Sequence, residues 1–276
     1  IDESLTRNSS VSSGQIYWNV LNRERTGDYL GRTVQIIPHI TDEIKRNVKL
    51  LGNKYKFDFV ITEIGGTVGD IESLPFIESV RQLKWELGKN CICVHLTYVP
   101  YIAAAKEYKT KPTQHSVKEL QSVGIQPDVL VLRAEHPLSD GLRKKVAQFC
   151  NVDDKAVVQS IDAETIYEVP LLMQAQGLDS TILEKMGLPV GETPGLGPWR
   201  KFLERRHAAE TKEPINIALV GKYDLQDAYK SIREALSQAG TYNDRKVEVH
   251  FVNSEKLTDE NVAEALKGMS GVLIGP

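Results

Sequence analysis

The sequence lacks the features that would mark several large classes of protein. No run approaches the roughly 18 consecutive apolar residues that a membrane-spanning helix needs, so we expect no membrane partner. Neither sign of charge dominates, because 34 Lys and Arg stand against 37 Asp and Glu. The overall charge therefore favours neither nucleic acid nor an acidic membrane surface, and any phosphate-binding site must be local.

Cysteine is scarce. Cys91, Cys93 and Cys150 all lie in apolar runs, and their odd number and the lack of a signal peptide indicate a reducing compartment, which we predict to be the cytoplasm. A zinc site at Cys91 and Cys93 would need two further ligands, for which the sequence offers no candidates. We interpret all three cysteines as buried thiols.

Two motifs of nucleotide and nucleophile chemistry are also missing. The 276 residues contain no Gly-x-x-x-x-Gly-Lys-Ser/Thr phosphate loop and no serine nucleophile elbow. If ATP is a substrate, its main phosphate cradle must lie elsewhere. Residues 1–14 are polar and serine-rich, with no strand that could open a doubly wound domain, so we expect further residues to precede Ile1.

What the sequence does contain is an alternation of short apolar runs with helical patterns. Runs rich in β-branched residues predict strands at 57–64, 91–99, 129–133 and 157–161. Apolar residues three or four apart predict helices at 70–87 and 113–123. Strands that alternate with helices are typical of an α/β domain with a parallel sheet.

Residues 187–214 are rich in proline and glycine and then strongly charged. This composition is typical of a linker. A new buried strand follows at 215–220, then a helix around 228–239 and strands at 247–252 and 271–274. We therefore predict one domain over 1–188, a linker over 189–214, and the start of a second α/β domain over 215–276.

A glycine-rich turn follows the first predicted strand, from Glu63 through Gly65, Gly66 and Gly69 to Asp70. Ligands of open α/β sheets bind beyond the carboxyl ends of the strands, where glycines allow close approach of the backbone. Glu63 could hold a magnesium ion, which prefers carboxylate and phosphate oxygens. The alternative is that the glycines only make a tight connection and that Glu63 is a surface acid.

A lysine-rich segment, Lys106–Ser116, follows the predicted strand 91–99. Lys109 and Lys111 bracket a hydroxyl group, and Thr113 is placed to cap the following helix. Two ammonium groups near unpaired helix amides would suit a triphosphate. The alternative is a solvated loop, and a further basic group, Arg143–Lys145, has the pattern of a solvated helix face.

Long segments of the sequence resemble the CTP synthase family. They include Gly27–Gly31, Thr33–Thr41, Glu63–Gln82, His95–Tyr101 and Lys109–Leu120 with Gly124–Asp128. Gly221–Tyr223 and Asp227–Ser231 resemble the opening of that family's glutaminase domain. The resemblance implies a P-loop-type synthetase domain with a parallel sheet, followed by the start of a flavodoxin-like class I glutamine amidotransferase domain.

The resemblance also implies roles for particular residues. Glu63 would bind magnesium, and Asp70, Ile71 and Glu72 would contact the pyrimidine nucleotide, notably CTP as feedback inhibitor. Ala163 falls where the family approaches the adenine of ATP. Further contacts to UTP or CTP are implied for Lys109, Thr110, Lys111, Pro112, Thr113, Gln114 and Lys145.

The activity implied by the resemblance is the ATP-dependent amination of UTP to CTP with ammonia from glutamine. It implies Mg²⁺ as cofactor, ATP as co-substrate, GTP as effector and a homotetramer. The family's phosphate loop would precede Ile1 and its glutaminase cysteine would follow Pro276, so we expect residues 1–276 alone to be inactive. Two alternatives stay open: another ATP-dependent amidoligase, or a non-catalytic nucleotide-binding or interaction module.

Overall fold

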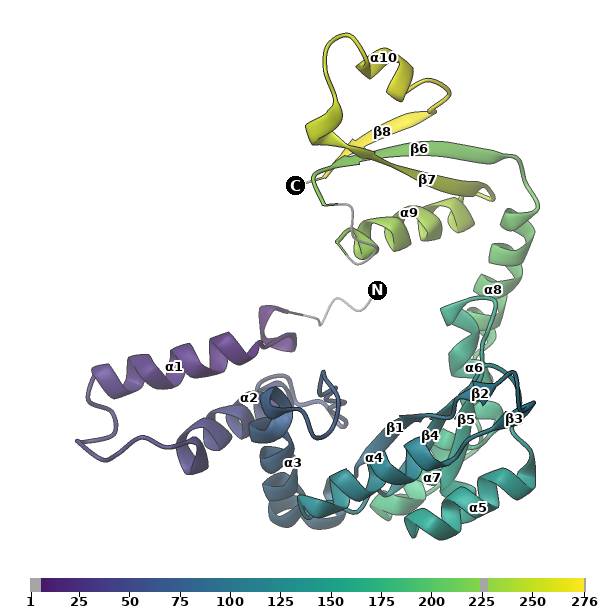
Figure 1. The fold of residues 1–276 in the computed structure, drawn as a ribbon. Helices are drawn as coiled ribbons and strands as arrows, with labels where there is room; N and C mark the ends of the chain where they lie inside the picture. The colour runs from purple at the N-terminus through teal and green to yellow at the C-terminus, as the bar shows by residue number, and fades with distance from the viewer. Residues whose placement is uncertain (1–5, 224–227, 276) are drawn as a thin grey trace. The chain divides into compact units, whose positions relative to one another are not determined.

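The structure is a computed structural model that describes residues 6–223 and 228–275. The chain divides into two compact units, Ile1–Glu192 and Thr193–Pro276, which are called unit 1 and unit 2 and are described separately. Figure 1 shows the elements of each unit along the chain. Among the described helices, none has the length and apolar character needed to cross a membrane.

Unit 1 is built on a parallel sheet of three strands, β1 (Val94–Tyr98), β4 (Val129–Arg133) and β5 (Val157–Ser160), in the order β1-β4-β5. Val94 pairs with Val129, and Leu130 pairs with Val157. The first four residues of β4 are all buried. A continuous apolar run suits this central position, because both faces of a parallel sheet are covered by other elements.

Helices α4 (Lys111–Ser122) and α5 (Asp140–Cys150) pack together and against this sheet, while α6 (Val169–Ala175) packs on β5 and precedes α7 (Leu178–Met186). The main core joins β4 and β5 to α4 and α5, with Val117, Leu130 and Val146 among its buried members. A short antiparallel hairpin, β2 (Tyr101–Ile102) and β3 (Glu107–Tyr108), lies between β1 and α4. The hairpin places the lysine-rich segment immediately after the sheet.

The N-terminal part of unit 1 is helical. Helix α1 (Ser13–Arg25) packs on α2 (Thr41–Tyr55) through Ile16, Val20 and Ile44, and α2 packs against α3 (Leu74–Leu87). Ser12 caps α1 by accepting a hydrogen bond from the Gln15 amide at 3.2 Å.

Unit 2 contains a second parallel sheet, β6 (Pro214–Gly221), β7 (Lys246–Asn253) and β8 (Gly271–Ile274), in the order β7-β6-β8. Helix α9 (Lys230–Tyr242) packs against β7 and against α8 (Gly197–Glu210), whose Arg206 donates to Ser237 Oγ at 2.7 Å. A short helix, α10 (Val262–Ala265), precedes β8. Asp227 of the glutaminase-like motif lies outside the described residues.

Most predicted elements are confirmed. The strands at 129–133 and 271–274 have the predicted bounds, and the other sheet strands differ by at most three residues at either end. The helix predicted at 70–87 is a short turn, Ile71–Ser73, that continues into α3. The predicted linker 189–214 contains α8, and the division between the two units falls within it. The predicted domain bounds themselves remain predictions.

The strand predicted at 57–64 is wrong. These residues form no strand, and most of their apolar side chains are exposed, with Ile61 at 96%. A β-strand needs a neighbouring strand for its backbone N–H and C=O groups. Among the described residues, none pairs with this segment, so its β-branched composition is not enough to make a strand.

Two smaller predictions are also wrong. The helix predicted from Thr113 begins at Lys111, because Pro112 is suited to the first helical turn, and Thr113 therefore lies inside the helix and does not cap it. Cys150 is buried as predicted, whereas Cys91 and Cys93 are half-buried. Burial nevertheless raises the pKa of all three thiols, that of Cys93 to about 11.

Candidate nucleotide-binding site

The lysine-rich segment lies at the end of the β1-β4-β5 sheet where the carboxyl ends of the strands meet, which is called the carboxyl edge. The Lys109 amide donates to the Pro100 carbonyl at 3.0 Å, just beyond the end of β1. Helix α4 then begins at Lys111, so its unpaired N-terminal amides lie beside this edge. In open parallel sheets, this is the edge at which ligands bind.

Buried polar side chains fix the first turn of α4 to the sheet. Thr113 is 0% exposed, and its Oγ1 donates to the Tyr98 carbonyl at 3.2 Å and accepts from Thr97 Oγ1 at 3.3 Å. Gln114 is buried and donates to Thr110 Oγ1 at 3.2 Å. Because these groups are buried and bonded, the start of α4 has a defined position relative to β1.

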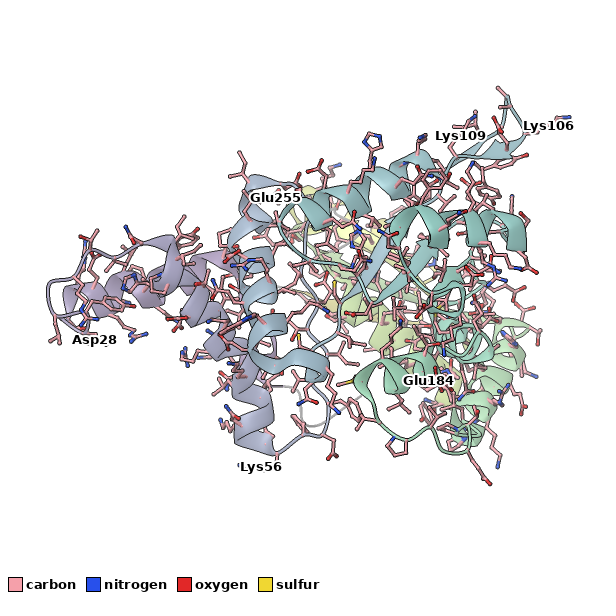
Figure 2. The ribbon with its side chains drawn as sticks, turned by 90° about the horizontal axis from the view of Figure 1, so that it is seen from below. Asp28, Lys56, Lys106, Lys109, Glu184 and Glu255 are labelled. Carbon is pink, nitrogen blue, oxygen red and sulfur yellow. The ribbon has the colours of Figure 1, made fainter. Side chains whose placement is uncertain are left out.

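The charged side chains of the segment face outward. Lys109 projects from the β2–β3 hairpin near Lys106 and forms an ion pair with Glu107 (Figure 2). Lys111 is exposed and makes no hydrogen bond or ion pair with any described residue. A free ammonium group at the N-terminus of a helix combines two features that attract phosphate.

Arg133 and Asp162 lie at the same edge and were not predicted as site residues. Arg133 ends β4, and its guanidinium contacts Asp162 Oδ1 at 2.5 Å beyond the end of β5. Ala163 follows directly and is half-buried. The sequence signal for Arg133 is a single cation at the end of the apolar run Val129–Leu132. The structure thus brings Ala163 and the lysine-rich segment to one edge of the sheet.

The glycine turn lies at the other end of α4. Ile64 and Val68 pack against a cluster that includes Leu120 and Ile125, at the C-terminal end of that helix. A Cβ at Gly69 would lie 3.9 Å from Glu119 Oε2. Because α4 has 12 residues at about 1.5 Å per residue, its two ends are roughly 17 Å apart.

Glu63, Asp70, Ile71 and Glu72 are all exposed, with Ile71 at 83%. The turn is held by its backbone and by Ser73, whose hydroxyl donates to the carbonyls of Thr67 at 3.1 Å and Asp70 at 2.9 Å. Gly66 and Gly69 have φ values of 97° and 103°, which favour glycine. The structure therefore does not bring Glu63 together with the lysine-rich segment.

Lys145 lies on α5 and is exposed. It forms no hydrogen bond or ion pair with the described part of the chain. Its neighbour Arg143 contacts Asp140 at 2.5 Å. Helices α4 and α5 pack against each other and against the sheet. In the part of the chain that the structure describes, no hydrogen bond or ion pair joins Lys145 to Lys109 or Lys111.

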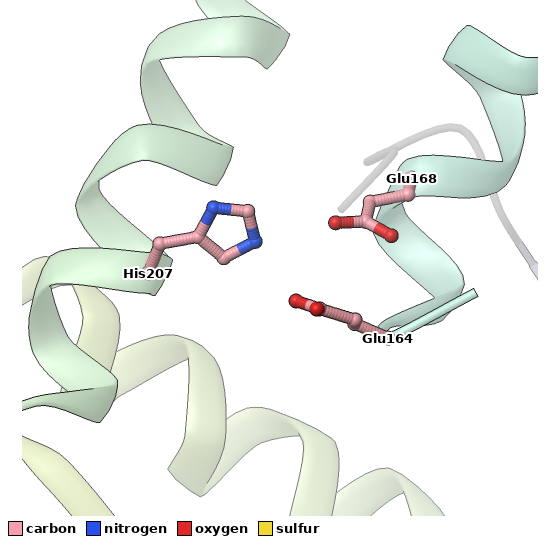
Figure 3. A group of neighbouring side chains, drawn as sticks. All are labelled: Glu164, Glu168 and His207. Atoms are coloured by element: carbon pink, nitrogen blue, oxygen red, sulfur yellow. The ribbon is translucent and has the colours of Figure 1, made fainter.

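Two carboxylates lie just beyond Ala163. Glu164 and Glu168 project in the same direction, and Figure 3 draws them with His207, which belongs to α8 of unit 2. Of these three residues, only the two glutamates belong to unit 1. Two carboxylates alone do not define a metal site, because exposed acidic pairs are common on protein surfaces.

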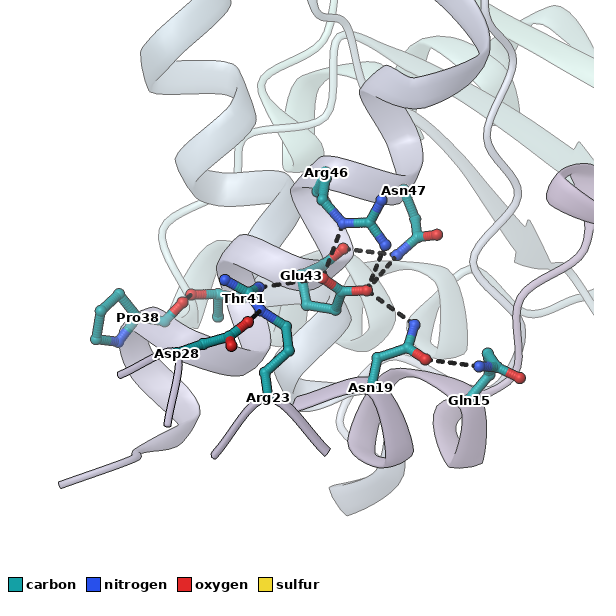
Figure 4. A network of polar contacts seen from close by, with 9 residues as sticks. All are labelled: Gln15, Asn19, Arg23, Asp28, Pro38, Thr41, Glu43, Arg46 and Asn47. Carbon is teal, nitrogen blue, oxygen red and sulfur yellow. Dashed lines mark hydrogen bonds and ion pairs between the residues drawn. The ribbon is translucent and has the colours of Figure 1, made fainter. Parts of the chain in front are cut away.

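A hollow of about 550 Å³ between α1 and α2 is lined by Asn19, Asn22, Arg23, Glu43 and Arg46. Figure 4 shows the polar contacts of this region, including those of Glu43. Its charges are already paired: Arg46 donates two bonds to Glu43, at 2.6 and 2.8 Å, and Arg23 contacts Asp28 at 3.2 Å. Burial raises the pKa of Glu43, but hydrogen bonds from Arg46 and Asn19 outweigh burial and lower it. Asn19 of α1 donates to Glu43 Oε1 of α2 at 2.9 Å, so we interpret the network as a polar contact that joins the two helices.

Comparison with known proteins identifies the family of the chain. A family model described as the CTP synthase N-terminus matches residues 1–188. CTP synthase of Bacteroides thetaiotaomicron is 90% identical over 271 residues, that of Bacteroides fragilis 71% over 272 and that of Porphyromonas gingivalis 65% over 272. Each match covers 98% of this chain and 50% or 51% of the relative. The chain thus spans about half the length of these curated relatives.

The parallel sheets and the cationic helix start define an α/β protein with a candidate phosphate-binding edge. The chain belongs to the CTP synthase family.

Proposed function

We propose that this chain is part of an enzyme that converts UTP to CTP, with ATP as co-substrate and glutamine as the source of ammonia. The observation that carries the proposal is the position of Lys109 and Lys111 at the N-terminus of α4, beside the carboxyl edge of the sheet. Family membership supports the choice of a pyrimidine nucleotide over other phosphate ligands.

In the proposed reaction, the uracil O4 attacks the γ-phosphorus of ATP and ADP leaves. Ammonia then attacks C4, and phosphate departs. The residues of this chain would bind and orient the substrate: Lys109 and Lys111 would neutralise the phosphates, and the amides of α4 would donate hydrogen bonds to them. Thr113 and Gln114 are buried, and would hold the start of the helix in position.

Magnesium would compensate the charge of the transferred phosphoryl group. Glu63 is suited to bind this ion, because its carboxylate is exposed and makes no hydrogen bond or ion pair with any residue that the structure describes. Mg²⁺ needs only one or two protein carboxylates, since phosphate oxygens and water supply its other ligands. The same proposal includes three further contacts. Asp70, Ile71 and Glu72 would contact CTP, Lys145 would contact UTP or CTP, and Ala163 would contact ATP.

Family membership also motivates proposals that go beyond these residues. Unit 2 would belong to a glutamine amidotransferase domain, GTP would act as an effector, and the enzyme would be a cytoplasmic homotetramer. Inactivity of residues 1–276 alone remains a prediction.

The proposal is tested on the complete protein that carries these residues. Purified protein is supplied with UTP, ATP and Mg²⁺, and CTP formation is measured with glutamine and with ammonia. CTP formation with both nitrogen sources is expected. Amination of another acceptor without UTP would favour a different amidoligase, and nucleotide binding without turnover would favour a non-catalytic module.

A further inference from the structure

In the parallel sheet of unit 2, the order in which successive strands are added reverses at β6. The chain passes from β6 to β7 on one side and then crosses to β8 on the other, which gives the order β7-β6-β8. In an open parallel sheet, the ligand crevice lies beyond the carboxyl ends of the two strands at which this reversal occurs. In unit 2 these strands are β6, which ends at Gly221, and β8, which ends at Ile274.

One side chain lies between these two strand ends. Tyr229 precedes α9 and is 3% exposed. Its Oη accepts hydrogen bonds from the backbone amides of Lys222 at 3.1 Å and Tyr223 at 3.4 Å. The phenol therefore holds the backbone that leaves β6, and its ring lies 6.0 Å from the ring of Phe251 on β7.

The packing around Tyr229 requires glycine at both strand ends. A Cβ at Gly221 would lie 2.4 Å from Tyr229 Oη, and a Cβ at Gly275 would lie 2.9 Å from the Cε1 atom of the same ring. Gly275 is itself fixed by donation of its amide to the Val220 carbonyl at 2.8 Å. The phenol thus contacts the ends of β6 and β8 together.

We infer that Tyr229 forms the floor of the ligand crevice of unit 2 and is a positioning residue for glutamine there. The inference rests on the proposed function, because it takes unit 2 to bind glutamine. Tyr229 is too deeply buried to be the reacting group. It acts by fixing the backbone at the ends of β6 and β8, against which a ligand at the reversal point would be bound.

The test is Tyr229→Phe in the complete protein, a change that keeps the ring and removes only the hydroxyl group. The amides of Lys222 and Tyr223 then lose their acceptor inside the fold. Because both amides that hold the end of β6 lose their acceptor, the KM for glutamine is expected to rise about tenfold, while CTP formation from ammonia stays within about twofold. Tyr242→Phe is the matched control, because it makes the same change at the exposed far end of α9.

The two possible failures are distinguishable. If the unsubstituted protein forms no CTP from UTP with either nitrogen source, the proposed function fails. If it forms CTP with both, and Tyr229→Phe leaves the glutamine kinetics unchanged or lowers the rates with glutamine and ammonia equally, the positioning role of Tyr229 is wrong.

Discussion

The two ends of α4 differ in how their neighbouring segments are held. At its N-terminus, the lysine-rich segment is fixed by buried hydroxyl and amide groups, above all Thr113 and Gln114. At its C-terminus, the glycine turn leaves Glu63 and Ile71 exposed and is tied to the core by Ile64 and Val68. Unit 1 by itself therefore fixes the first segment with buried, hydrogen-bonded side chains, whereas it leaves the acidic side chains of the second exposed.

Because of this difference, substitutions at the two ends of α4 should differ in how they affect turnover and the stability of unit 1. Exposed residues of the glycine turn, such as Glu63, should matter for turnover and hardly at all for the folding of unit 1. Residues under the lysine-rich segment should matter for both. Substitutions at the two ends of α4 therefore test whether the two segments differ in this way.

The largest effect is expected for Glu63→Ala in the complete protein. If Glu63 binds magnesium as proposed, its loss removes charge compensation worth several kcal/mol, so magnesium-dependent CTP formation should fall by more than about 100-fold. Because Glu63 is exposed, the melting temperature should not change. Asp58→Ala, in the same exposed segment, is the control, and normal turnover of Glu63→Ala would reject the metal role.

A smaller effect, on stability, is expected for Thr113→Val. This change keeps the shape of the side chain but leaves the Tyr98 carbonyl and the Thr97 hydroxyl without their partner. The free energy of unfolding should fall by about 1–2 kcal/mol, measured by urea denaturation. Ser122→Ala removes an exposed hydroxyl at the other end of α4 and should cost less than about 0.5 kcal/mol. Equal losses of unfolding free energy in Thr113→Val and Ser122→Ala would contradict the stated difference between the two ends of α4.

The smallest effect concerns pH. His95 on β1 contacts Ser116 Oγ of α4 at 2.9 Å, and burial lowers the pKa of His95 from 6.5. The unfolded chain thus binds the proton more readily, so stability should fall as the pH drops below about 6.5 and level off below the folded pKa. The loss is at most about 1.4 kcal/mol per pH unit. His95→Gln should flatten this part of the Tm-against-pH curve; an unchanged curve would reject the assignment to His95.

How far the sequence predicts the structure depends on the physical origin of each signal. The run Val129–Arg133 marks a strand buried on both faces, and the structure confirms its bounds. Phe57–Ile64 has a similar composition but no strand beside it, and a partner cannot be read from local composition. Charge marks the segment Lys106–Ser116 in the sequence, but the nucleotide contacts of Lys109–Gln114 are implied only by the family resemblance and stay a prediction. The pairing of Arg133 with Asp162 depends on neighbouring strands and cannot be read from local composition.

The most direct test of the central claim is UTP binding by unit 1, measured by calorimetry on residues 1–276 with Lys111→Ala and Lys118→Ala. Both lysines are exposed on α4, but only Lys111 lies at its N-terminus. We predict that Lys111→Ala weakens UTP binding about tenfold and that Lys118→Ala changes it less than twofold, since a charge-assisted hydrogen bond contributes about 1.5–3 kcal/mol. Equal affinities of Lys111→Ala and the unsubstituted chain for UTP would contradict the account.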